Sequence, residues 1–296
     1  MKERTIYALG FFDGVHLGHQ ALLRTCKELA AKHGCRAGVV TFTTHPDSLV
    51  SGKTPALINT PADRRHLLTE FGMEDVVELP FDNALMSMNW QDFIRLLRTE
   101  YGAAGFVCGD DFRFGYRGQG TAQILQAYCL DAGLPQATVP EQAVDGVRVS
   151  SSYIRELMET GQMAQALRFL GHPHILSGTV VRGRQLGRTI GIPTANLALP
   201  EGVICPKRGV YACTAVADGK QYLAVTNIGT RPTVGGHHVT VEPWLLDFDG
   251  DLYGKPLTLA FYDFLRPEQK FDSLEQLQAA IRKNADQTRE RLEATL

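Results

Sequence analysis

Four apolar runs in the first 170 residues stand out against an otherwise mixed pattern. They lie at Thr5–Phe12, Ala37–Phe42, Val76–Phe81 and Gly105–Cys108, and none of them alternates apolar with polar positions for long. Continuous apolar runs of this length are typical of strands that are buried on both faces of a sheet. We therefore expect these runs to form buried strands of one sheet.

Segments with helical periodicity lie between the apolar runs. They begin near Leu17, Pro61, Asn89 and Thr121, and Thr60, directly before Pro61, has a side chain suited to an N-cap. Strands that alternate with helices in this way form parallel sheets. The pattern predicts an α/β domain of the Rossmann-like type, a doubly wound parallel sheet with helices on both faces.

The pattern changes in the second half of the chain. Two short helical segments at Ser152–Thr160 and Gln162–Leu170 are followed, between Gly178 and Tyr262, by short β-rich runs that Gly and Pro interrupt. Closely spaced short strands predict a barrel or a sandwich. A capping box of Ser273 and Gln276 then predicts a C-terminal helix.

The change of pattern falls at Gly171–His174. At roughly 150 residues per domain, 296 residues suggest two domains, and we place them at residues 1–172 and 173–296. The 30 basic and 32 acidic residues give a formal charge of -2, which provides no general attraction for nucleic acid or an anionic membrane. We expect small-molecule partners, and either a monomer or a weak homo-oligomer.

The six cysteines form no C-x-x-C pair, so the sequence does not predict a zinc ribbon or a thioredoxin-type site. Cys26, Cys108 and Cys213 lie in apolar segments and are expected to be buried and reduced. The N-terminus lacks the features of a signal peptide, and no uncharged run reaches the roughly 18 residues of a membrane span. These features favour a cytoplasmic protein.

A turn rich in glycine and histidine follows the first predicted strand. Gly14 and Gly18 would let the backbone approach a ligand, and His16 and His19 would share one face of the next helix. The carboxyl end of a strand in an open parallel sheet, followed by a helix N-terminus, is a place where phosphates bind. The turn therefore predicts a polyphosphate site in which two imidazoles stabilise developing charge.

Two other interpretations of this turn stay open at the sequence level. His16 and His19 would be ordinary turn histidines if no cavity lies beside them. They would be metal ligands if Asp13 or His45 completed the set, although no zinc-type spacing follows.

Three further segments would reach the same edge of a doubly wound sheet. They are residues 41–46, residues 109–117 and residues 150–155, and each follows a strand or begins a helix. Serine hydroxyls, a helix N-terminus and Arg155 together suit a triphosphate.

These motifs, in this order, resemble the adenylyltransferase half of prokaryotic bifunctional riboflavin kinase/FAD synthetases. The resemblance implies a nucleotidyltransferase fold in which His16 and His19 stabilise the transfer of AMP from ATP to FMN. It also implies that Asp110 and Phe112 lie near the flavin. The chain departs from the family pattern at Thr44 and at Ser152-Tyr153. The residues that the resemblance assigns to ATP are Gly10, Phe12, Asp13, Gly14, His16, His19, Ser151, Ser152 and Arg155.

A second group of candidate residues lies in the β-rich half. Gly187 and Arg188 belong to a Gly/Arg-rich loop that is not a Walker loop, because the glycine spacing is short and Arg replaces Lys. Thr194 and Asn196 follow, and their hydroxyl and amide oxygens suit a Mg²⁺ ion that keeps several waters. Arginine can pair with phosphate oxygens. This loop therefore has the parts of a Mg–ATP site.

Glu242 lies within a mostly apolar strand pattern. A carboxylate in such a strand suggests a general base, and the alternative is a glutamate on the solvent face of an edge strand. Gly-x-Pro-Thr-Ala-Asn, Val241-Glu242 and the later Phe264-Leu265-Arg266-Pro267 resemble the riboflavin kinase half of the same enzymes. That resemblance implies a six-stranded antiparallel barrel with a C-terminal helix. In it, Thr194 and Asn196 bind Mg–ATP and Glu242 accepts the proton of the ribityl hydroxyl.

The two halves together predict a bifunctional enzyme of flavin cofactor synthesis. The C-terminal domain would phosphorylate riboflavin to FMN with ATP, and the N-terminal domain would adenylylate FMN to FAD and release pyrophosphate. Both steps are attacks at phosphorus, where positioning and charge stabilisation supply most of the catalysis. Two alternatives remain, another nucleotidyltransferase with the same histidine motif and a non-catalytic flavin-binding regulator.

Overall fold

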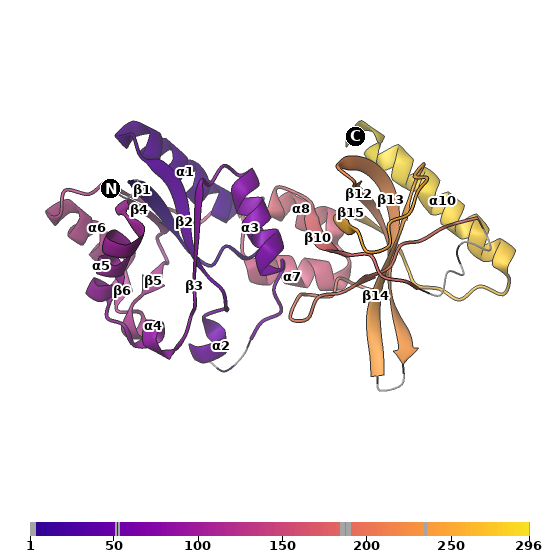
Figure 1. Ribbon diagram of the computed structural model, residues 1–296, viewed down its shortest axis with the longest axis horizontal. Helices are drawn as coiled ribbons and strands as arrows, with labels where there is room; N and C mark the ends of the chain where they lie inside the picture. The colour runs from indigo at the N-terminus through magenta and orange to yellow at the C-terminus, as the bar shows by residue number, and fades with distance from the viewer. Residues whose placement is uncertain are drawn as a thin grey trace. The chain divides into compact units, whose positions relative to one another are not determined.

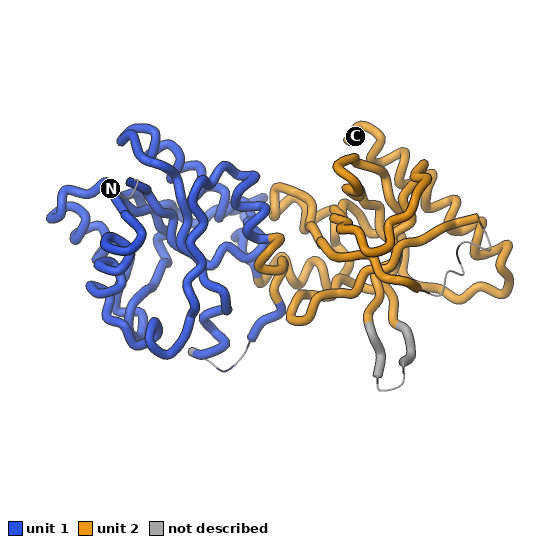
Figure 2. Tube along the Cα trace, in the orientation of Figure 1, with its two compact units in different colours: residues 1–56, 64–151 blue, residues 57–63, 152–296 orange. Residues whose placement is uncertain are grey.

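The computed structural model describes residues 4–50, 52, 54–183, 187, 191–233 and 236–295 (Figure 1). Its contacts divide the chain into two compact units, shown in Figure 2. The first unit holds residues 1–56 and 64–151, and the second holds residues 57–63 and 152–296.

The first unit is built on a five-stranded parallel sheet with the order β3-β2-β1-β4-β7. Every neighbouring pair of these strands runs parallel, so the predicted parallel sheet is confirmed. The fifth strand, β7, has no continuous apolar run and was not expected as a core strand. The strands are β1 Thr5–Leu9, β2 Arg36–Phe42, β3 Asp75–Leu79, β4 Ala103–Gly109 and β7 Gln136–Val139.

Helices cover both faces of this sheet, as predicted. Tyr7 and Leu9 point toward α5 and α6, where they join one core cluster with Leu97 and Leu125. Side chains alternate between faces along a strand, so Ile6 points to the opposite face, which α1 covers. The helices of this unit are α1 Leu17–His33, α2 Asp47–Val50, α3 Pro61–Glu70, α4 Asn83–Ser87, α5 Trp90–Tyr101 and α6 Ala122–Asp131.

Side-chain caps fix where the helices begin. Thr60 Oγ1 accepts a hydrogen bond from the Asp63 N–H at 3.0 Å, and Asn89 and Thr121 cap α5 and α6 in the same way. Each cap satisfies one of the N–H groups that a helix leaves free at its first turn. At the other end of α1, Gly34 has a left-handed backbone that ends the helix.

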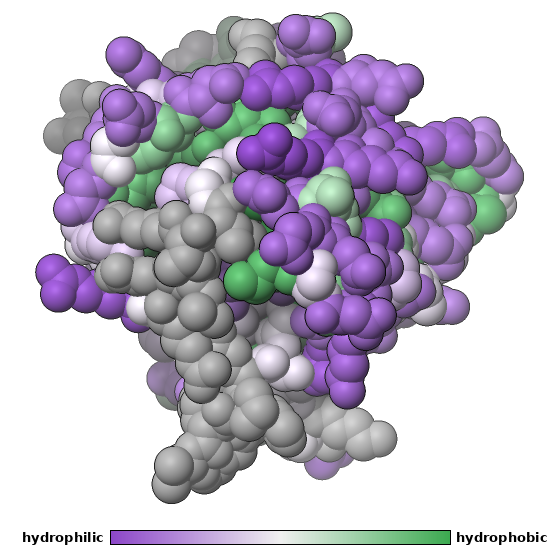
Figure 3. Space-filling model, turned by 90° about the vertical axis from the view of Figure 1, so that its right-hand side faces the viewer, coloured by the Kyte–Doolittle hydropathy of each residue, from purple (hydrophilic) through white to green (hydrophobic). Residues whose placement is uncertain are grey.

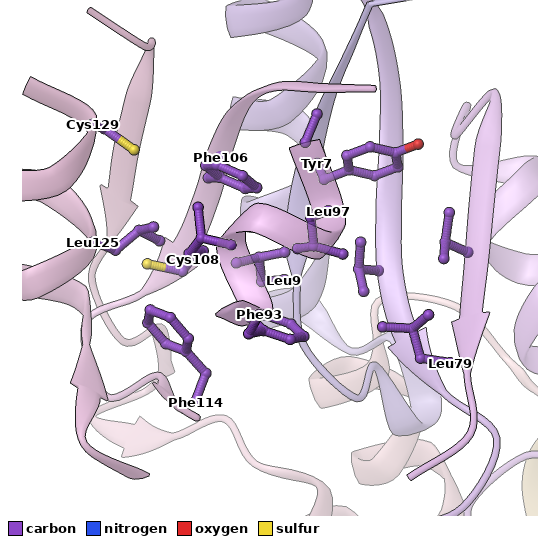
Figure 4. Packing of buried hydrophobic residues seen from close by; sticks show 14 of the residues in the cluster. Tyr7, Leu9, Leu79, Phe93, Leu97, Phe106, Cys108, Phe114, Leu125 and Cys129 are labelled. Atoms are coloured by element: carbon purple, nitrogen blue, oxygen red, sulfur yellow. The ribbon is translucent and has the colours of Figure 1, made fainter. Parts of the chain in front are cut away.

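Figure 4 shows the core between the sheet and the helices α5 and α6. Tyr7, Leu97 and Phe106 are each fully buried, and Phe93 and Phe114 pack at a ring distance of 5.7 Å. This packing holds β1 and β4 firmly side by side, so that their carboxyl ends form a fixed edge.

Two small hairpins and two short 3-10 helices complete the first unit. The hairpin of β8 and β9 turns at Asp145 and Gly146, both of which have positive φ. Asp-Gly is a sequence favoured for such a turn. The elements are η1 Asp13–Val15, β5 Arg113–Phe114, η2 Tyr116–Gly118, β6 Gly120–Thr121, β8 Ala143–Val144 and β9 Val147–Arg148.

The second unit contains a six-stranded antiparallel sheet with the order β10-β15-β12-β13-β14-β11, which is nearly closed into a barrel. Its two end strands approach each other where Gly178 lies against Leu197 and where the Val181 N–H donates to Asn196 O at 2.9 Å. The predicted barrel is confirmed. The strands are β10 His174–Thr179, β11 Leu197–Ala198, β12 Gly209–Ala217, β13 Lys220–Thr233, β14 Gly236–Leu245 and β15 Pro256–Pro267.

Two helices that the sequence pattern groups with the first domain pack with the barrel. Helix α8 packs against β15, and the Lys207 N–H donates to Met158 O of α7 at 2.9 Å. The segment 57–63 joins them, since the Asn59 amide donates to Ile175 O at 3.1 Å. The boundary between the two compact units therefore lies at residues 151–152, earlier than residue 172. These helices are α7 Ser151–Thr160 and α8 Met163–Leu170.

The predicted C-terminal helix is α10, Leu274–Leu292, followed by η3, Glu293–Thr295. Ser273 Oγ accepts from the Gln276 N–H at 3.2 Å, which confirms the N-cap. Leu274, in the first turn, is 61% exposed, so this apolar side chain does not join the core. Among the described helices, none combines the length and apolar character needed to cross a bilayer.

The cysteines that the pattern predicts to be buried are buried. Cys26, Cys108 and Cys213 are fully inaccessible, and burial raises the pKa of the Cys26 and Cys108 thiols to about 11. A thiol with a raised pKa is a poor nucleophile at neutral pH. These cysteines serve as small apolar core residues.

Candidate active sites

A cavity of about 320 Å³ opens at the carboxyl ends of β1, β4 and β7. It lies where the strand order reverses, because the chain leaves β1 toward β2 on one side and reaches β4 on the other. Ligands bind at such switch points in open α/β sheets. Of the residues assigned to ATP or flavin by resemblance, Gly10, His16, His19, Asp110, Phe112 and Ser151 line the cavity.

The turn between β1 and α1 has an unusual backbone. Phe12 is fully buried with φ 60°, a left-handed conformation that costs free energy for a residue with a large side chain. Gly14 follows with φ 79°, and Thr41 Oγ1 donates to Phe11 O at 2.8 Å. Asp13 is only 2% exposed and does not line the cavity. The surrounding core thus holds the turn in the shape that brings the next residues to the cavity.

The two histidines stack on each other at the start of α1. Their ring centres are 3.6 Å apart and the planes differ by 13°. His16 is the N-cap, and its Nδ1 accepts a hydrogen bond from the His19 N–H at 3.3 Å. The spacing of three residues therefore places both imidazoles on one face, as predicted, and both rings line a cavity, which favours the polyphosphate interpretation over that of ordinary turn histidines.

His19 is held in the neutral state. Burial, with the charges of His16 and Arg64, keeps the pKa of His19 well below its ordinary value. The ring of Phe12 lies 5.2 Å from it, and His19 Nδ1 has no hydrogen-bond partner among the residues that the structure describes. A neutral imidazole here offers an N–H group to a ligand without carrying a permanent charge.

Phe112, assigned to the flavin by resemblance, and the serines at 151 and 152, assigned to ATP, come from different segments of the chain. Phe112 stacks on Phe114 with ring centres 5.5 Å apart. Ser151 Oγ donates to Asp13 O at 2.9 Å, which ties the start of α7 to the turn. Ser152 is exposed, and neither it nor Arg155 lines the cavity of the first unit.

The β8–β9 hairpin contributes cavity residues that the sequence analysis missed. Arg148 forms ion pairs with Asp111 at 2.9 Å and with Glu141 at 2.6 Å, and all three side chains line the cavity. The Asp145-Gly146 turn signal could have located this hairpin. That turn signal does not show which site the hairpin contacts.

The metal-site alternative for the histidines gains no support. The described part of the chain holds no group of three or more His, Cys, Asp or Glu side chains suited to a metal ion. His45 instead contacts the Phe11 ring edge-on at 4.5 Å, and its Nδ1 accepts from the Asp47 N–H at 3.2 Å.

A second cavity, of about 650 Å³, lies in the barrel unit. Glu242, Thr194 and Gly187 line it together with apolar and aromatic residues such as Trp244 and Leu277. Leu274 also lines it, which explains why this leucine of α10 is exposed. The face of the second unit drawn in Figure 3 has hydrophobic side chains gathered in patches among hydrophilic ones.

Strand pairing brings Thr194 and Asn196 to Glu242. Leu197 pairs with Val241, and the Ala195 N–H donates to Pro243 O at 2.8 Å. The segment 194–197 therefore runs antiparallel beside the glutamate. Two groups that are more than 45 positions apart in the sequence become neighbours at one end of the barrel.

Glu242 lies on an inner strand of the sheet, between β13 and β11, and not on an edge strand. It pairs in register with Asn227, is half-buried, and its Oε1 accepts from Thr240 Oγ1 at 3.0 Å. The solvent-face interpretation is therefore wrong, since the carboxylate faces a cavity.

Glycines let the backbone pack closely around the hydroxyl and the amide. A Cβ atom at Gly183 would lie 2.4 Å from Nδ2 of Asn196, and one at Gly187 would lie 2.1 Å from Ile192 O. Asn196 itself is 6% exposed. The candidate Arg188 lies outside the described residues.

A smaller chamber of about 330 Å³ lies on the other side of Thr194. Phe248, Tyr253, Asp249 and Val180 are among the residues that line it. Thr194 lines both this chamber and the larger cavity, so the two adjoin at this residue.

Comparison with known proteins now decides between the alternatives. A family model for FAD synthetase matches residues 1–153, and one for riboflavin kinase matches residues 170–292. A bifunctional riboflavin kinase/FMN adenylyltransferase from Escherichia coli is 37% identical over 292 residues, which cover 98% of this chain and 93% of that protein. The chain belongs to the bifunctional riboflavin kinase/FMN adenylyltransferase family.

A further relative and one solved structure also match nearly the whole chain. The Bacillus subtilis protein of the same name is 33% identical over 288 residues, with 96% of this chain and 91% of that protein covered. A crystal structure from Streptococcus pneumoniae, whose title reads macrolide-efflux protein, matches with a TM-score of 0.87 and 31% identity over 98% of this chain and 95% of that chain. The family's two regions both lie within this chain, so it is an enzyme with riboflavin kinase and FMN adenylyltransferase activities.

Proposed function

We propose that the cavity of the first unit is where FMN is adenylylated. The observation that carries this assignment is the stacked pair His16 and His19 at the N-terminus of α1, lining a cavity at the sheet's switch point. An FMN phosphate oxygen attacks the α-phosphorus of ATP. The bond from that phosphorus to the bridging oxygen breaks, and pyrophosphate leaves with the electron pair.

The imidazole N–H groups and the free N–H groups at the start of α1 stabilise the negative charge that builds on the phosphates. Gly10, Phe12, Asp13 and Gly14 shape the turn that presents them. Ser151 lines the same cavity, and we assign Ser152 and Arg155 to ATP from the family resemblance alone, since neither of them lines it.

Asp110 and Phe112 belong to the flavin side of the same cavity. Phe112 lines the cavity and is backed by the buried Phe114, so it offers an aromatic ring of the kind that a planar flavin packs against. Asp110 offers a carboxylate that accepts hydrogen bonds from the ring edge or the ribityl chain.

The cavity of about 650 Å³ in the barrel is the proposed site of riboflavin phosphorylation. Its aromatic and apolar lining suits an isoalloxazine ring, and Glu242 would accept the proton of the terminal ribityl hydroxyl. The hydroxyl oxygen then attacks the γ-phosphorus of ATP, and ADP leaves. The adjoining chamber lined by Phe248 and Tyr253 suits the adenine of that ATP.

Mg²⁺ is the proposed metal of this kinase site, held with ATP by Thr194 and Asn196. The fit rests on the chemistry of the donors, a hydroxyl and an amide oxygen, and on the glycine cradle at Gly183 and Gly187 that a Cβ would fill. When bound, the ion neutralises phosphate charge. Arg188 would pair with the phosphates.

We also propose that the catalytic modules correspond to residues 1–172 and 173–296 and that the protein works in the cytoplasm on small-molecule substrates alone. A monomer or a weak homo-oligomer is the state we infer. The charge of -2 offers no general attraction for nucleic acid or anionic lipid.

Single substitutions test how the two activities are divided. Glu242→Gln removes the base and keeps the side-chain shape, so it should abolish FMN formation from riboflavin and leave adenylylation of supplied FMN. His19→Asn should do the opposite. Both activities are followed by chromatography of the flavins with ATP, with and without a chelator. Equal loss of both activities in either variant would contradict the assignment.

A further inference from the structure

Helix α3 carries a buried arginine that the sequence pattern does not single out. Arg64 is 1% exposed and is among the largest fully buried side chains, whereas its neighbour Arg65 is exposed and pairs with Glu78 at 2.6 Å. Burying a guanidinium group costs free energy unless nearby groups pair with its charge and accept hydrogen bonds from its N–H groups. The position of Arg64 therefore calls for an explanation.

The contacts of Arg64 join two strand ends behind the first cavity. Its Nη2 donates to Phe42 O, the last residue of β2, at 2.6 Å. Its guanidinium carbon lies 4.4 Å from the ring centre of Phe11, which follows β1 and lines the cavity. Nε and Nη1 have no hydrogen-bond partner within the part of the chain that the structure describes.

The charge of Arg64 acts on the histidine site. Burial lowers the pKa of Arg64, and the carboxylates of Asp13 and Glu78 oppose this, so the group stays cationic. Its charge, after burial and His16, contributes to the low pKa of His19. The other charged side chains that face the cavity are Asp110, Asp111, Glu141 and Arg148.

We propose that Arg64 is a positioning residue for adenylyl transfer, which clamps Phe11 and the end of β2 behind the cavity and supplies a buried positive charge behind that wall. The proposal rests on the proposed function of this cavity. A fixed charge in a water-poor site acts on phosphates more strongly than a surface charge does, because it is not screened. It also needs no reorganisation when charge develops on the phosphates.

Two variants separate the charge from the shape. Arg64→Met removes the charge and retains an apolar side chain, and Arg64→Lys keeps the charge and loses the planar fork that stacks on Phe11. Arg95→Met is the matched control, because Arg95 is exposed on α5 and pairs only locally with Asp92 at 2.7 Å. Riboflavin phosphorylation by the same molecules is the internal control.

Arg64→Met should raise the KM for ATP in adenylylation about tenfold, which corresponds to about 1.4 kcal/mol. Its acid limb of kcat/KM should move to higher pH, because the pKa of His19 rises when a neighbouring cation is removed. Arg64→Lys should keep the KM and the acid limb close to those of the parent enzyme while its kcat falls. Arg95→Met should change nothing. ATP binding by calorimetry provides a readout that does not depend on turnover.

An unchanged KM and acid limb in folded Arg64→Met would overturn the proposal. If that variant does not fold, Arg64→Lys still decides, since a tenfold loss of ATP affinity in this charged variant contradicts the role of the charge. A parent enzyme that binds ATP in the first unit but makes no FAD would instead contradict the proposed function.

Discussion

Gly183 offers the sharpest test of the kinase site, because its missing side chain leaves room for Asn196. In Gly183→Ala the new Cβ would lie 2.4 Å from Nδ2 of Asn196 and 2.6 Å from Oδ1. Ordinary contacts of a Cβ atom begin near 3.4 Å, so the amide must retreat by about 1 Å. The amide cannot move freely, since Asn196 is 6% exposed and its backbone O is held by Val181.

The size of the effect follows from that displacement. A misplacement of about 1 Å in a group that positions a reacting phosphate can cost about 100-fold in rate. Overpacking a buried site costs about 1–3 kcal/mol of stability. We therefore expect riboflavin phosphorylation to fall about 100-fold while the barrel stays folded. Adenylylation of supplied FMN should be unchanged, because Gly183 lies in the other unit.

The assay compares Gly183→Ala with Gly178→Ala. Gly178 lies on β10 of the same unit, and a Cβ there would contact Leu197 at 3.4 Å, which is an ordinary distance. Steady-state formation of FMN from riboflavin and of FAD from FMN are measured for both variants, together with thermal unfolding. Full kinase activity in folded Gly183→Ala would refute the claim that Asn196 positions Mg–ATP.

Two further predictions concern stability. Leu97→Ala should destabilise the first unit by about 2–5 kcal/mol in urea unfolding, because Leu97 is fully buried between α5 and the sheet; a loss below 1 kcal/mol would contradict the packing argument. Arg289→Met should cost less than about 1 kcal/mol at pH 7, because its pair with Asp247 is largely exposed. Hydrogen bonds from Arg289 lower the pKa of Asp247, so the pair stabilises the fold above about pH 4 and this contribution is lost as the pH falls through the lowered pKa. An equal loss at pH 3 and pH 7 would contradict this.

The sequence predicted the parallel sheet well because its central strands are buried on both faces. The runs at Thr5–Phe12 and Ala37–Phe42 contain β1 and β2, and both strands are buried along most of their length, although β1 ends at Leu9. The sequence analysis missed the fifth strand, β7, because Gln136–Val139 lies at the edge of the sheet and is only partly buried. This strand carries no continuous apolar run, so periodicity does not reveal it, whereas the other edge strand, β3, was found because it holds Val76, Val77 and Leu79.

The grouping of α7 and α8 with the barrel could not be read from periodicity. An amphipathic pattern shows that a helix has an apolar face, but it does not say which neighbour covers that face. Only contacts such as the hydrogen bond from Lys207 to Met158 settle the question.

Some features of the candidate sites depend on residues that are close together in the sequence, and others depend on residues that only the fold brings together. The turn with His16 and His19 is local, since strand, turn and helix start follow each other directly, and its geometry followed from spacing. Arg64 is non-local, because its spacing from Leu67 and Leu68 places it on the apolar face of α3 but does not show which site lies beyond that face. Its role depends on the sheet order that brings β2 beside β1.

The hydrogen bond that begins α1 also fixes the chemistry of the first site. The Nδ1 atom of His16 accepts the N–H of His19, so a neutral His16 ring carries its proton on Nε2. The same bond holds the His19 backbone, and the two rings then stack at 3.6 Å. Because one bond caps the helix and sets the tautomer, His16 and His19 are not equivalent. Losing the His16 ring removes both the cap and an N–H donor, whereas losing the His19 ring removes a donor and the stacking contact but leaves the cap of α1 in place.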